Sequence, residues 1–193
     1  QAFGVTEPDA GSETTRIKTF ARRDGDNYVI SGQKVFISRA QHSDLMLLLA
    51  RTTPYEELED KTRGLSIFMV DLIEAQASKQ VEIVPLDMMF NHHTTQIFIN
   101  DLVVPAENLV GKEGEGFRHI LDGMNAERIL VASQSVGDGN WFVEKAAAYG
   151  KERHVFGRPI AQNQGVQFPI AQAYARVQAS TLVRDKAAWL FDN

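Results

Sequence analysis

The chain has 193 residues, of which 44% are hydrophobic, a size and composition that suit one medium domain or two small ones. Its formal net charge of −5 comes from 20 basic and 25 acidic residues without a long run of one sign, so neither a nucleic-acid groove nor a polybasic membrane anchor is expected. The absence of cysteine excludes disulfides and thiolate chemistry, and the longest apolar runs, such as LMLLLA, are too short to span a bilayer.

Both ends of the sequence have the character of internal protein sequence. It begins QAFGVTEPDAGS, with neither a Met, a basic segment nor a signal-like core. It ends AAWLFDN, inside an apolar helical pattern that has no capping signal. We therefore interpret the chain as a piece of a longer protein.

Residues 1–110 have the pattern of a β domain. Short runs of apolar and β-branched residues are separated by turn formers and charges, at 26–38, 43–52, 64–72, 81–86 and 95–104. Such spacing without a helical period predicts an antiparallel β-barrel or sandwich. Within the first run Ser31-Gly32 is expected to form a turn, and the polar segment 52–62 is expected to be a loop.

The pattern changes after Pro105, where glycines at 111, 114 and 116 mark a boundary. From there the apolar residues recur with a period of 3.6, which predicts helices. We expect three: one from about 117 to 131, one from about 140 to 153, and one over 165–191 with a kink near Pro169. The fold class is therefore α+β, with a β domain over 1–110 and helices of a second domain over 111–193.

Two motifs do not indicate a ligand-binding or metal site. GKEGEG (111–116) lacks the spacing and the final Lys-Ser/Thr of a phosphate-binding loop, so we expect a flexible loop between domains. His92 and His93 are adjacent, and neighbours on a strand point to opposite faces, so the pair is not expected to chelate one ion. No metal site is predicted.

Two further motifs leave alternatives open. TEPDAGS (6–12) is either an ordinary turn or a loop whose hydroxyl and N–H groups hold a phosphate or the edge of a heteroaromatic ring. In ERHVFGRP (152–159), Arg153 and Arg158 beside Phe156 suit a pyrophosphate or nucleotide. The alternative is a helix C-terminus whose basic side chains satisfy the last carbonyls.

The segment GMNAERILVA (123–132) places a carboxylate on an apolar helix stripe. Ile120, Met124, Glu127 and Val131 follow one another at spacings of three and four. A buried carboxylate without a partner is costly, so such a group is kept when it is paired or used. Glu127 is therefore either at the edge of the stripe, paired with a basic residue of a neighbouring helix, or a functional residue.

Taken together, five stretches in this order resemble the acyl-CoA dehydrogenases: FGVTEPDAGS, GQKVFIS, VPAENLVGKEGEGF, MNAERILVA and ERHVFGRPIAQNQGVQF. The resemblance covers essentially the whole chain. It implies that residues 1–110 are the family's middle β domain and that residues 111–193 are the first helices of an up-down, C-terminal four-helix bundle. Family members usually assemble as tetramers.

The resemblance also implies a reaction. The family binds FAD and oxidises acyl-CoA thioesters to trans-2-enoyl-CoA: a carboxylate removes the α-proton, and a hydride passes from the β-carbon to the flavin. Electrons then pass to an electron-transferring flavoprotein, as in fatty-acid β-oxidation. The expected compartment is the cytoplasm of a bacterium or the mitochondrial matrix of a eukaryote. The alternatives are an acyl-CoA oxidase or related flavin oxidase of the same fold, or a non-catalytic module.

Residue by residue, the resemblance assigns a site. The positions that match the family's FAD contacts are Phe3, Val5, Thr6, Gly11, Ser12, Phe36, Ile37, Ser38, Arg153, Phe156 and Gln164. Of these, Arg153 and Phe156 resemble contacts to the FAD of a neighbouring subunit, and Gln164 matches a nearby FAD contact. Ser12, Asn125 and Arg128 match positions near the acyl-CoA substrate. Glu127 falls where a minority of the family carries the catalytic base. Most members carry the base on a later helix, which is the competing placement.

Overall fold

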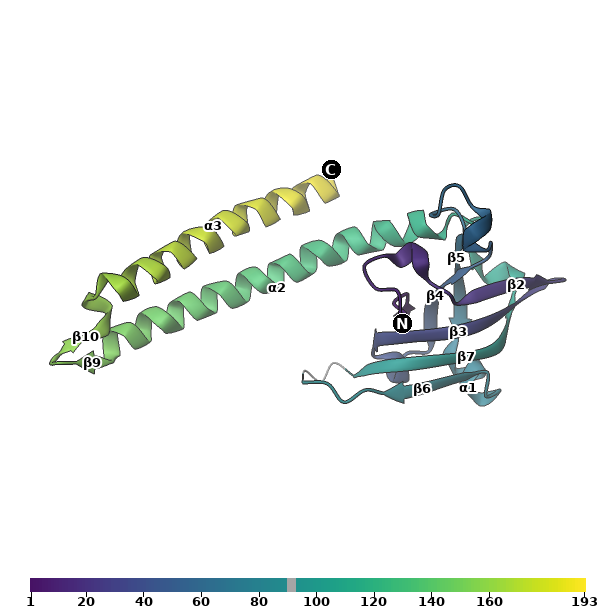
Figure 1. The fold of residues 1–193 in the computed structure, drawn as a ribbon, viewed down its shortest axis with the longest axis horizontal. Helices are drawn as coiled ribbons and strands as arrows, with labels where there is room; N and C mark the ends of the chain where they lie inside the picture. Colours follow the sequence, from purple (N-terminus) through teal and green to yellow (C-terminus); the bar gives the residue numbers. More distant parts are fainter. Residues whose placement is uncertain (90–92) are drawn as a thin grey trace. The chain divides into compact units, whose positions relative to one another are not determined.

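The computed structural model describes residues 1–89 and 93–193 (Figure 1). The chain forms two compact units, Gln1–Leu121 and Asp122–Asn193. The division between the units falls inside helix α2 (Gly116–Glu152). The domain boundary between residues 110 and 111 stays a prediction.

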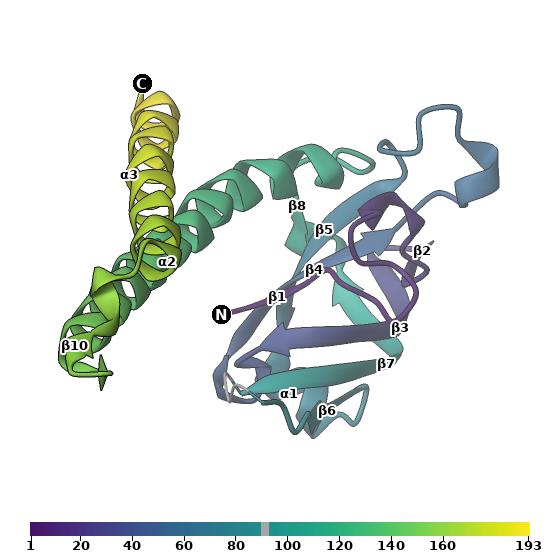
Figure 2. The same cartoon turned by 60° about the vertical axis from the view of Figure 1, so that its left-hand side comes forward.

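The first unit is built on a sheet of eight strands in the hydrogen-bonded order β6-β7-β3-β2-β4-β5-β8, with β1 paired to β4 (Figure 2). The strands are β1 (Ala2–Gly4), β2 (Phe20–Asp24), β3 (Asn27–Ser38), β4 (Leu45–Arg51), β5 (Leu65–Asp71), β6 (Val81–Pro85), β7 (Thr94–Pro105) and β8 (Leu109–Val110). The five predicted runs correspond to β3 to β7, so these strands and the α+β fold class are confirmed.

Two strand pairs depart from the predicted antiparallel arrangement. Strands β1 and β2 each run parallel to β4, β2 through a single residue pair. Parallel neighbours need a long connection between them, and the stretch from β1 to β4 supplies one by passing through β2 and β3. The all-antiparallel prediction is therefore wrong at these two pairs.

The predicted turn at Ser31-Gly32 is also wrong, because both residues lie inside the 12-residue strand β3. The pairing of β3 with β7 shifts register between Ile30 and Gly32, which is a bulge. Glycine is required there because a Cβ on Gly32 would lie 2.6 Å from the Cα of Thr19. Close backbone approach, rather than a change of direction, explains this glycine.

Short connections complete the first unit. The loop predicted at 52–62 is confirmed, with one 3₁₀ turn over Tyr55–Glu57. Helix α1 (Leu72–Ala77) was not predicted, because six residues are too few to display a helical period. Its N-cap is Asp71, whose carboxylate accepts the N–H groups of Ile73 and Glu74 at 2.9 and 3.0 Å.

The core of the first unit lies between the strands and consists of their inward-facing side chains. Its members include Tyr28, Ile30, Met46, Leu48, Phe68, Val70, Ile97 and Ile99. The Tyr28 and Phe68 rings pack edge to face with centroids 4.8 Å apart. The Tyr28 hydroxyl donates a hydrogen bond of 2.6 Å to Glu113, which ties the 111–116 loop to this core.

The second unit holds α2, the short hairpin β9 (His154–Val155) and β10 (Arg158–Pro159), and α3 (Gln164–Asp192), which runs back alongside α2 (Figure 1). The third predicted helix is confirmed as α3. The first two predicted helices are one continuous helix of 37 residues, so the predicted break is wrong. Among the described residues, no helix combines the length and apolar character needed to cross a membrane.

The glycines of α2 near residue 138 lie where the two predicted helices were separated, but the helix continues through them. Glycine in a helix costs about 1 kcal/mol relative to Ala, which lowers local helix propensity. Packing explains Gly139, because a Cβ there would lie 2.8 Å from a methyl group of Val177 on α3. The glycine lets the two helices approach, and tertiary contact outweighs local propensity.

Candidate functional site

The TEPDAGS segment forms a turn that is attached to β3. Glu7 and Ala10 exchange two backbone hydrogen bonds of 3.0 and 3.2 Å, which closes the turn, and residues 11–12 are exposed beyond it. Just before the turn, the carbonyl of Thr6 accepts the N–H of Val35 at 2.9 Å. The turn prediction is confirmed; its use as a ligand-binding loop stays a prediction.

Phe36 occupies a backbone conformation that is uncommon for an aromatic residue. Its φ is 59°, and the pairing of β3 with β7 shifts register between Lys34 and Ile37. This bulge turns Phe36 outward, so its side chain is 58% exposed while Ile37 is buried. Left-handed backbone costs such a residue about 1–2 kcal/mol, and conformations of this kind cluster at functional sites.

The turn and the bulge carry the predicted contacts of the first unit. These are Phe3, Val5, Thr6, Gly11 and Ser12 from one segment and Phe36, Ile37 and Ser38 from the other. The hydrogen bond from Val35 to Thr6 joins the two segments. Because Val5 and Ile37 are buried, they can offer a ligand main-chain atoms more readily than side chains.

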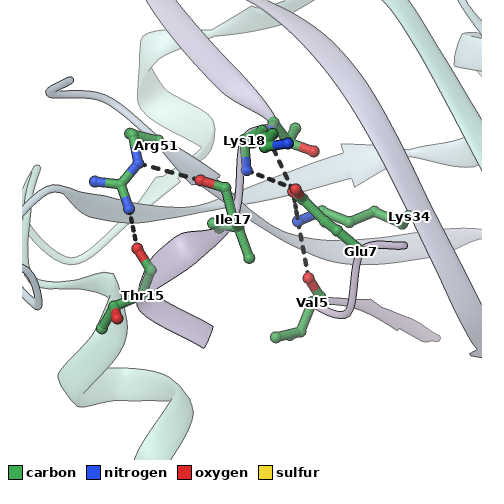
Figure 3. Close-up of polar contacts among 8 residues, drawn as sticks. Val5, Glu7, Thr15, Ile17, Lys18, Lys34 and Arg51 are labelled. Carbon is green, nitrogen blue, oxygen red and sulfur yellow. Dashed lines mark hydrogen bonds and ion pairs between the residues drawn. The ribbon is translucent and has the colours of Figure 1, made fainter. Parts of the chain in front are cut away.

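Beneath this surface lies a buried polar network that the sequence analysis missed (Figure 3). The Lys34 ammonium lies 2.9 Å from the Glu7 carboxylate and donates a second hydrogen bond, also 2.9 Å, to the carbonyl of Val5. The Glu7 carboxylate also accepts the backbone N–H groups of Lys18 and Thr19 at 2.5 and 2.9 Å. Glu7 therefore joins three separate segments of the chain.

One sequence signal could have revealed this network. Tyr28 and Ile30 of β3 face the core, and because alternate residues of a strand share a face, Lys34 is expected to face the core as well. A lysine at a core position needs a buried partner. That partner, Glu7, lies 27 residues away.

The buried pair has shifted pKa values. Burial alone would raise the pKa of the Glu7 carboxyl, but the Lys34 ammonium and the donated N–H bonds hold it below its ordinary value. Burial lowers the pKa of Lys34 to about 8, against the opposing effect of Glu7. Both partners therefore carry charge at neutral pH.

A buried guanidinium supports the segment that follows the turn. Arg51 of β4 donates hydrogen bonds to the carbonyls of Thr15 and Ile17, the latter at 3.2 Å (Figure 3). A further bond of 3.3 Å goes to the carbonyl of Thr53. A charged group that is removed from water in this way is satisfied by carbonyl oxygens. Arg51 thus anchors the chain immediately before Lys18 and Thr19, which donate to Glu7.

In the second unit, Glu127 lies on an exposed part of α2. It borders a concavity of about 480 Å³ whose lining consists of Met124, Glu127, Arg128, Val131, Ala132 and Ser135. Arg128 donates a 2.6 Å hydrogen bond to the Asn125 side chain. Within the described part of the chain, Glu127 makes no hydrogen bond or ion pair. The expected pair with a basic residue of a neighbouring helix is therefore not observed here.

The 152–159 motif forms a hairpin between α2 and α3. Phe156 and Gly157 occupy its tip with φ values of 50° and 76°, as a type I′ turn requires, and Phe156 is 100% exposed. Over residues 1–89 and 93–193, the side chains of Arg153 and Arg158 make no hydrogen bond, whereas the His154 ring lies 2.8 Å from the carbonyl of Glu152, the last residue of α2. The helix-capping alternative is therefore observed for His154 and not for the two arginines. Gln164 begins α3, after a 3₁₀ turn over Ile160–Gln162 that follows the hairpin.

The histidine motif falls partly outside the described residues, which exclude His92. The ring of His93 lies edge to face with that of His42, with centroids 4.7 Å apart. Among the residues that the structure describes, no group of three His, Cys, Asp or Glu side chains is arranged to hold a metal ion.

Comparisons with known proteins agree over both units. Residues 2–101 match the family model described as "Acyl-CoA dehydrogenase, middle domain", and residues 114–193 match "Acyl-CoA dehydrogenase, C-terminal domain". Acyl-CoA dehydrogenase fadE12 of Mycobacterium bovis is 37% identical over 192 residues, 100% of this chain and 48% of the relative. The caffeyl-CoA reductase-Etf complex subunit CarC of Acetobacterium woodii is 35% identical over 200 residues, 100% of this chain and 49% of the relative.

A solved structure gives the same result. The crystal structure of acyl-CoA dehydrogenase from Geobacillus kaustophilus matches 97% of this chain and 50% of its own, with a TM-score of 0.83 and 30% identity. The chain spans about half the length of the curated relatives it matches. The two domain matches follow one another along the chain, and the identity extends over all of it; the chain therefore belongs to the acyl-CoA dehydrogenase family.

Proposed function

We propose that this protein is an FAD-dependent acyl-CoA dehydrogenase that oxidises an acyl-CoA thioester to the trans-2-enoyl-CoA. The observation that carries the proposal is the exposed ring of Phe36 on its bulge, joined through Val35 to the Thr6 turn, in a chain of this family. These two segments are the ones whose sequence resembles the flavin contacts of the family.

The residues present fit a flavin. An isoalloxazine ring needs a flat apolar or aromatic surface and a few hydrogen-bonding groups at its edge. Phe36 supplies an outward-facing aromatic ring, and Thr6, Ser12 and Ser38 supply hydroxyl groups on the same two segments. The flavin, when bound, supplies the acceptor for the hydride.

Glu127 is the proposed base. Its carboxylate oxygen takes the α-proton of the thioester. Met124 and Val131 provide apolar neighbours in the concavity that Glu127 borders. Donors to the thioester carbonyl stabilise the charge that develops there. The competing assignment places the base on another carboxylate of the full-length protein.

The neighbours of Glu127 suit the CoA portion of the substrate. The hydrogen bond between Arg128 and Asn125 holds the two side chains together, and a guanidinium can bind phosphate through two parallel hydrogen bonds. Ser12 is the proposed contact to the acyl-CoA from the first unit. Its exposed position beyond the turn leaves its hydroxyl accessible to a ligand.

The hairpin is the proposed site for the FAD of a neighbouring subunit in a homotetramer. Arg153 would hold the diphosphate, while Phe156 and Gln164 would contact the remainder of the dinucleotide. The exposed ring of Phe156 supports this role, because a fully exposed aromatic side chain is available to a partner. An electron-transferring flavoprotein is the proposed electron acceptor; the relative from Acetobacterium woodii, named as a subunit of an Etf complex, supports it.

Rapid mixing of the full-length protein with acyl-CoA without oxygen tests the proposal. Wild-type flavin should be reduced, and Glu127→Gln should lower the rate constant of reduction by about 10³-fold or more with FAD still bound. Glu144→Gln, which changes another exposed carboxylate of α2, is the matched control and should react like wild type. Near wild-type reduction in Glu127→Gln would exclude Glu127 as the base. Full-length protein that stays colourless with added FAD would contradict the flavin assignment.

A further inference from the structure

The Lys34–Glu7 pair is buried directly beneath the two segments of the candidate site. The exposed fractions of the two side chains are 0% and 5%. In sequence, Lys34 comes two residues before Phe36, and Glu7 immediately follows Thr6. Each partner of the pair therefore belongs to one of the two proposed flavin-contacting segments.

Three hydrogen bonds in consecutive positions connect these segments. The Lys34 ammonium binds the carbonyl of Val5 and the carboxylate of Glu7, both at 2.9 Å. Between them, the N–H of Val35 binds the carbonyl of Thr6, also at 2.9 Å. The backbone on both sides of Thr6 is thus tied to the residues that lead into the Phe36 bulge.

Stability alone does not explain a pair of this kind. Removing two charges from water costs several kcal/mol for each ion, and apolar side chains of similar volume often stabilise a protein as well or better. A buried pair does, however, specify one arrangement, since a shifted register would leave a charge unpaired. The arrangement specified here is that of the Thr6 turn relative to the Phe36 bulge.

We propose that Lys34 and Glu7 are positioning residues, which fix the Thr6 turn against the Phe36 bulge so that both segments meet the same flavin. This proposal rests on the proposed function. Neither side chain needs to touch the flavin, because both are buried and act through the backbone of residues 5–7 and 35–37. Misplacement by about 1 Å can cost about 10²-fold in rate, so a loosened register should appear in the chemistry.

The test uses the full-length protein and the double variant Lys34→Met/Glu7→Gln, which removes both charges and keeps similar volumes. Glu13→Gln is the matched control, because it breaks an exposed ion pair immediately after the turn, in which Arg16 and Glu13 lie 3.0 Å apart. Three quantities are measured: the visible absorption of the bound flavin, the rate constant of its reduction per bound flavin, and the hydrogen exchange of the Val35 amide. The rate constant of reduction per bound flavin does not depend on the fraction of the protein that is folded.

We expect the double variant to fold and bind flavin, with a reduction rate constant at least ~10-fold below that of wild type, a shifted flavin absorption band and faster exchange at Val35. Glu13→Gln should match wild type in all three. A double variant with wild-type reduction, absorption and exchange would overturn the positioning role, and would show the pair to be structural only. If the double variant does not fold, Glu7→Asp replaces it in the test. This substitution withdraws the carboxylate from Lys34 but keeps the negative charge, and it should shift the same three quantities.

Failure of the proposed function would look different. Wild-type protein that binds no flavin would contradict the flavin assignment, whereas the exchange of Val35 would still report on the pair. Unchanged exchange in the double variant would overturn the positioning role in that case too. Faster exchange in the double variant, absent from Glu13→Gln, would support it.

Discussion

Glu7→Gln should destabilise the protein far more than its nearly unchanged size suggests. The Lys34 ammonium has two acceptors, the carbonyl of Val5 and the carboxylate of Glu7. The N–H groups of Lys18 and Thr19 bind different oxygens of the Glu7 carboxylate, and an amide has only one oxygen, so it can replace the acceptor for only one of them. An amide also cannot balance the charge of Lys34. The substitution therefore leaves a buried ammonium without a balancing negative charge.

The magnitude follows from the pKa of Lys34. Its pKa falls from 10.5 to about 8 in the folded protein even with Glu7 present, and this fall corresponds to about 3 kcal/mol. Removing Glu7 removes the effect that opposes burial, so the pKa of Lys34 falls further and the neutral form of its side chain becomes more populated at pH 7. Together with the loss of the charged hydrogen bond, we expect the free energy of unfolding to fall by about 3–5 kcal/mol at pH 7.

The pH dependence gives the sharper test. Where the pKa of a lysine is lower in the folded protein, the unfolded chain binds more protons, so stability rises with pH. In wild type, this rise from Lys34 occupies the window from about pH 8 to 10.5. In Glu7→Gln, the rise in stability with pH begins at lower pH. The difference in the free energy of unfolding between wild type and the variant should therefore shrink by up to about 1.4 kcal/mol between pH 7 and 8.

Thermal unfolding of the full-length protein, followed by circular dichroism at pH 7 and pH 8, measures both effects. Glu7→Gln should lower the Tm by several degrees at pH 7 and by less at pH 8. Asp9→Asn, whose partner Lys18 is exposed, should leave the Tm unchanged at both. A Tm for Glu7→Gln equal to that of Asp9→Asn, or a deficit independent of pH, would refute the charge-based reasoning.

Two further substitutions test other parts of the structure. Gly32→Ala should destabilise the protein by about 1–3 kcal/mol in urea unfolding, because the new methyl group would lie 2.6 Å from the Cα of Thr19. The control Gly123→Ala, whose new methyl group meets no atom within 4 Å outside its own helix backbone, should not destabilise the protein. Equal losses of stability in the two variants would contradict the packing argument. Phe156→Asn should keep the hairpin, since Asn tolerates positive φ, yet lower FAD affinity up to about 10-fold in ultrafiltration of the full-length protein. Unchanged affinity would remove Phe156 from the proposed cofactor site.

Much of the fold could be predicted because its main elements have local signals. The strands β3 to β7 alternate or run apolar over several residues, and α3 keeps a helical period. The misses have tertiary causes. The glycine at position 32 allows close approach to Thr19, and the one at 139 allows close approach to Val177. Neither neighbour can be identified from local sequence, so both regions were interpreted as breaks.

The candidate site divides in the same way. The segments 3–12 and 36–38 could be named because their order and composition resemble a family. Their connection through Lys34 and Glu7 could not, because an ion pair across 27 residues depends on strand arrangement rather than on local pattern. The exposure of Glu127 in this chain was likewise not predicted, since its spacing alone placed it on the apolar stripe.

A structure of the full-length protein with FAD and an acyl-CoA ligand tests the central claim most directly. We predict that the isoalloxazine ring lies against Phe36 and the Thr6–Ser12 turn, with the buried Lys34–Glu7 pair intact behind them. A flavin bound elsewhere, in contact with neither segment, would contradict the proposed site and the positioning role derived from it.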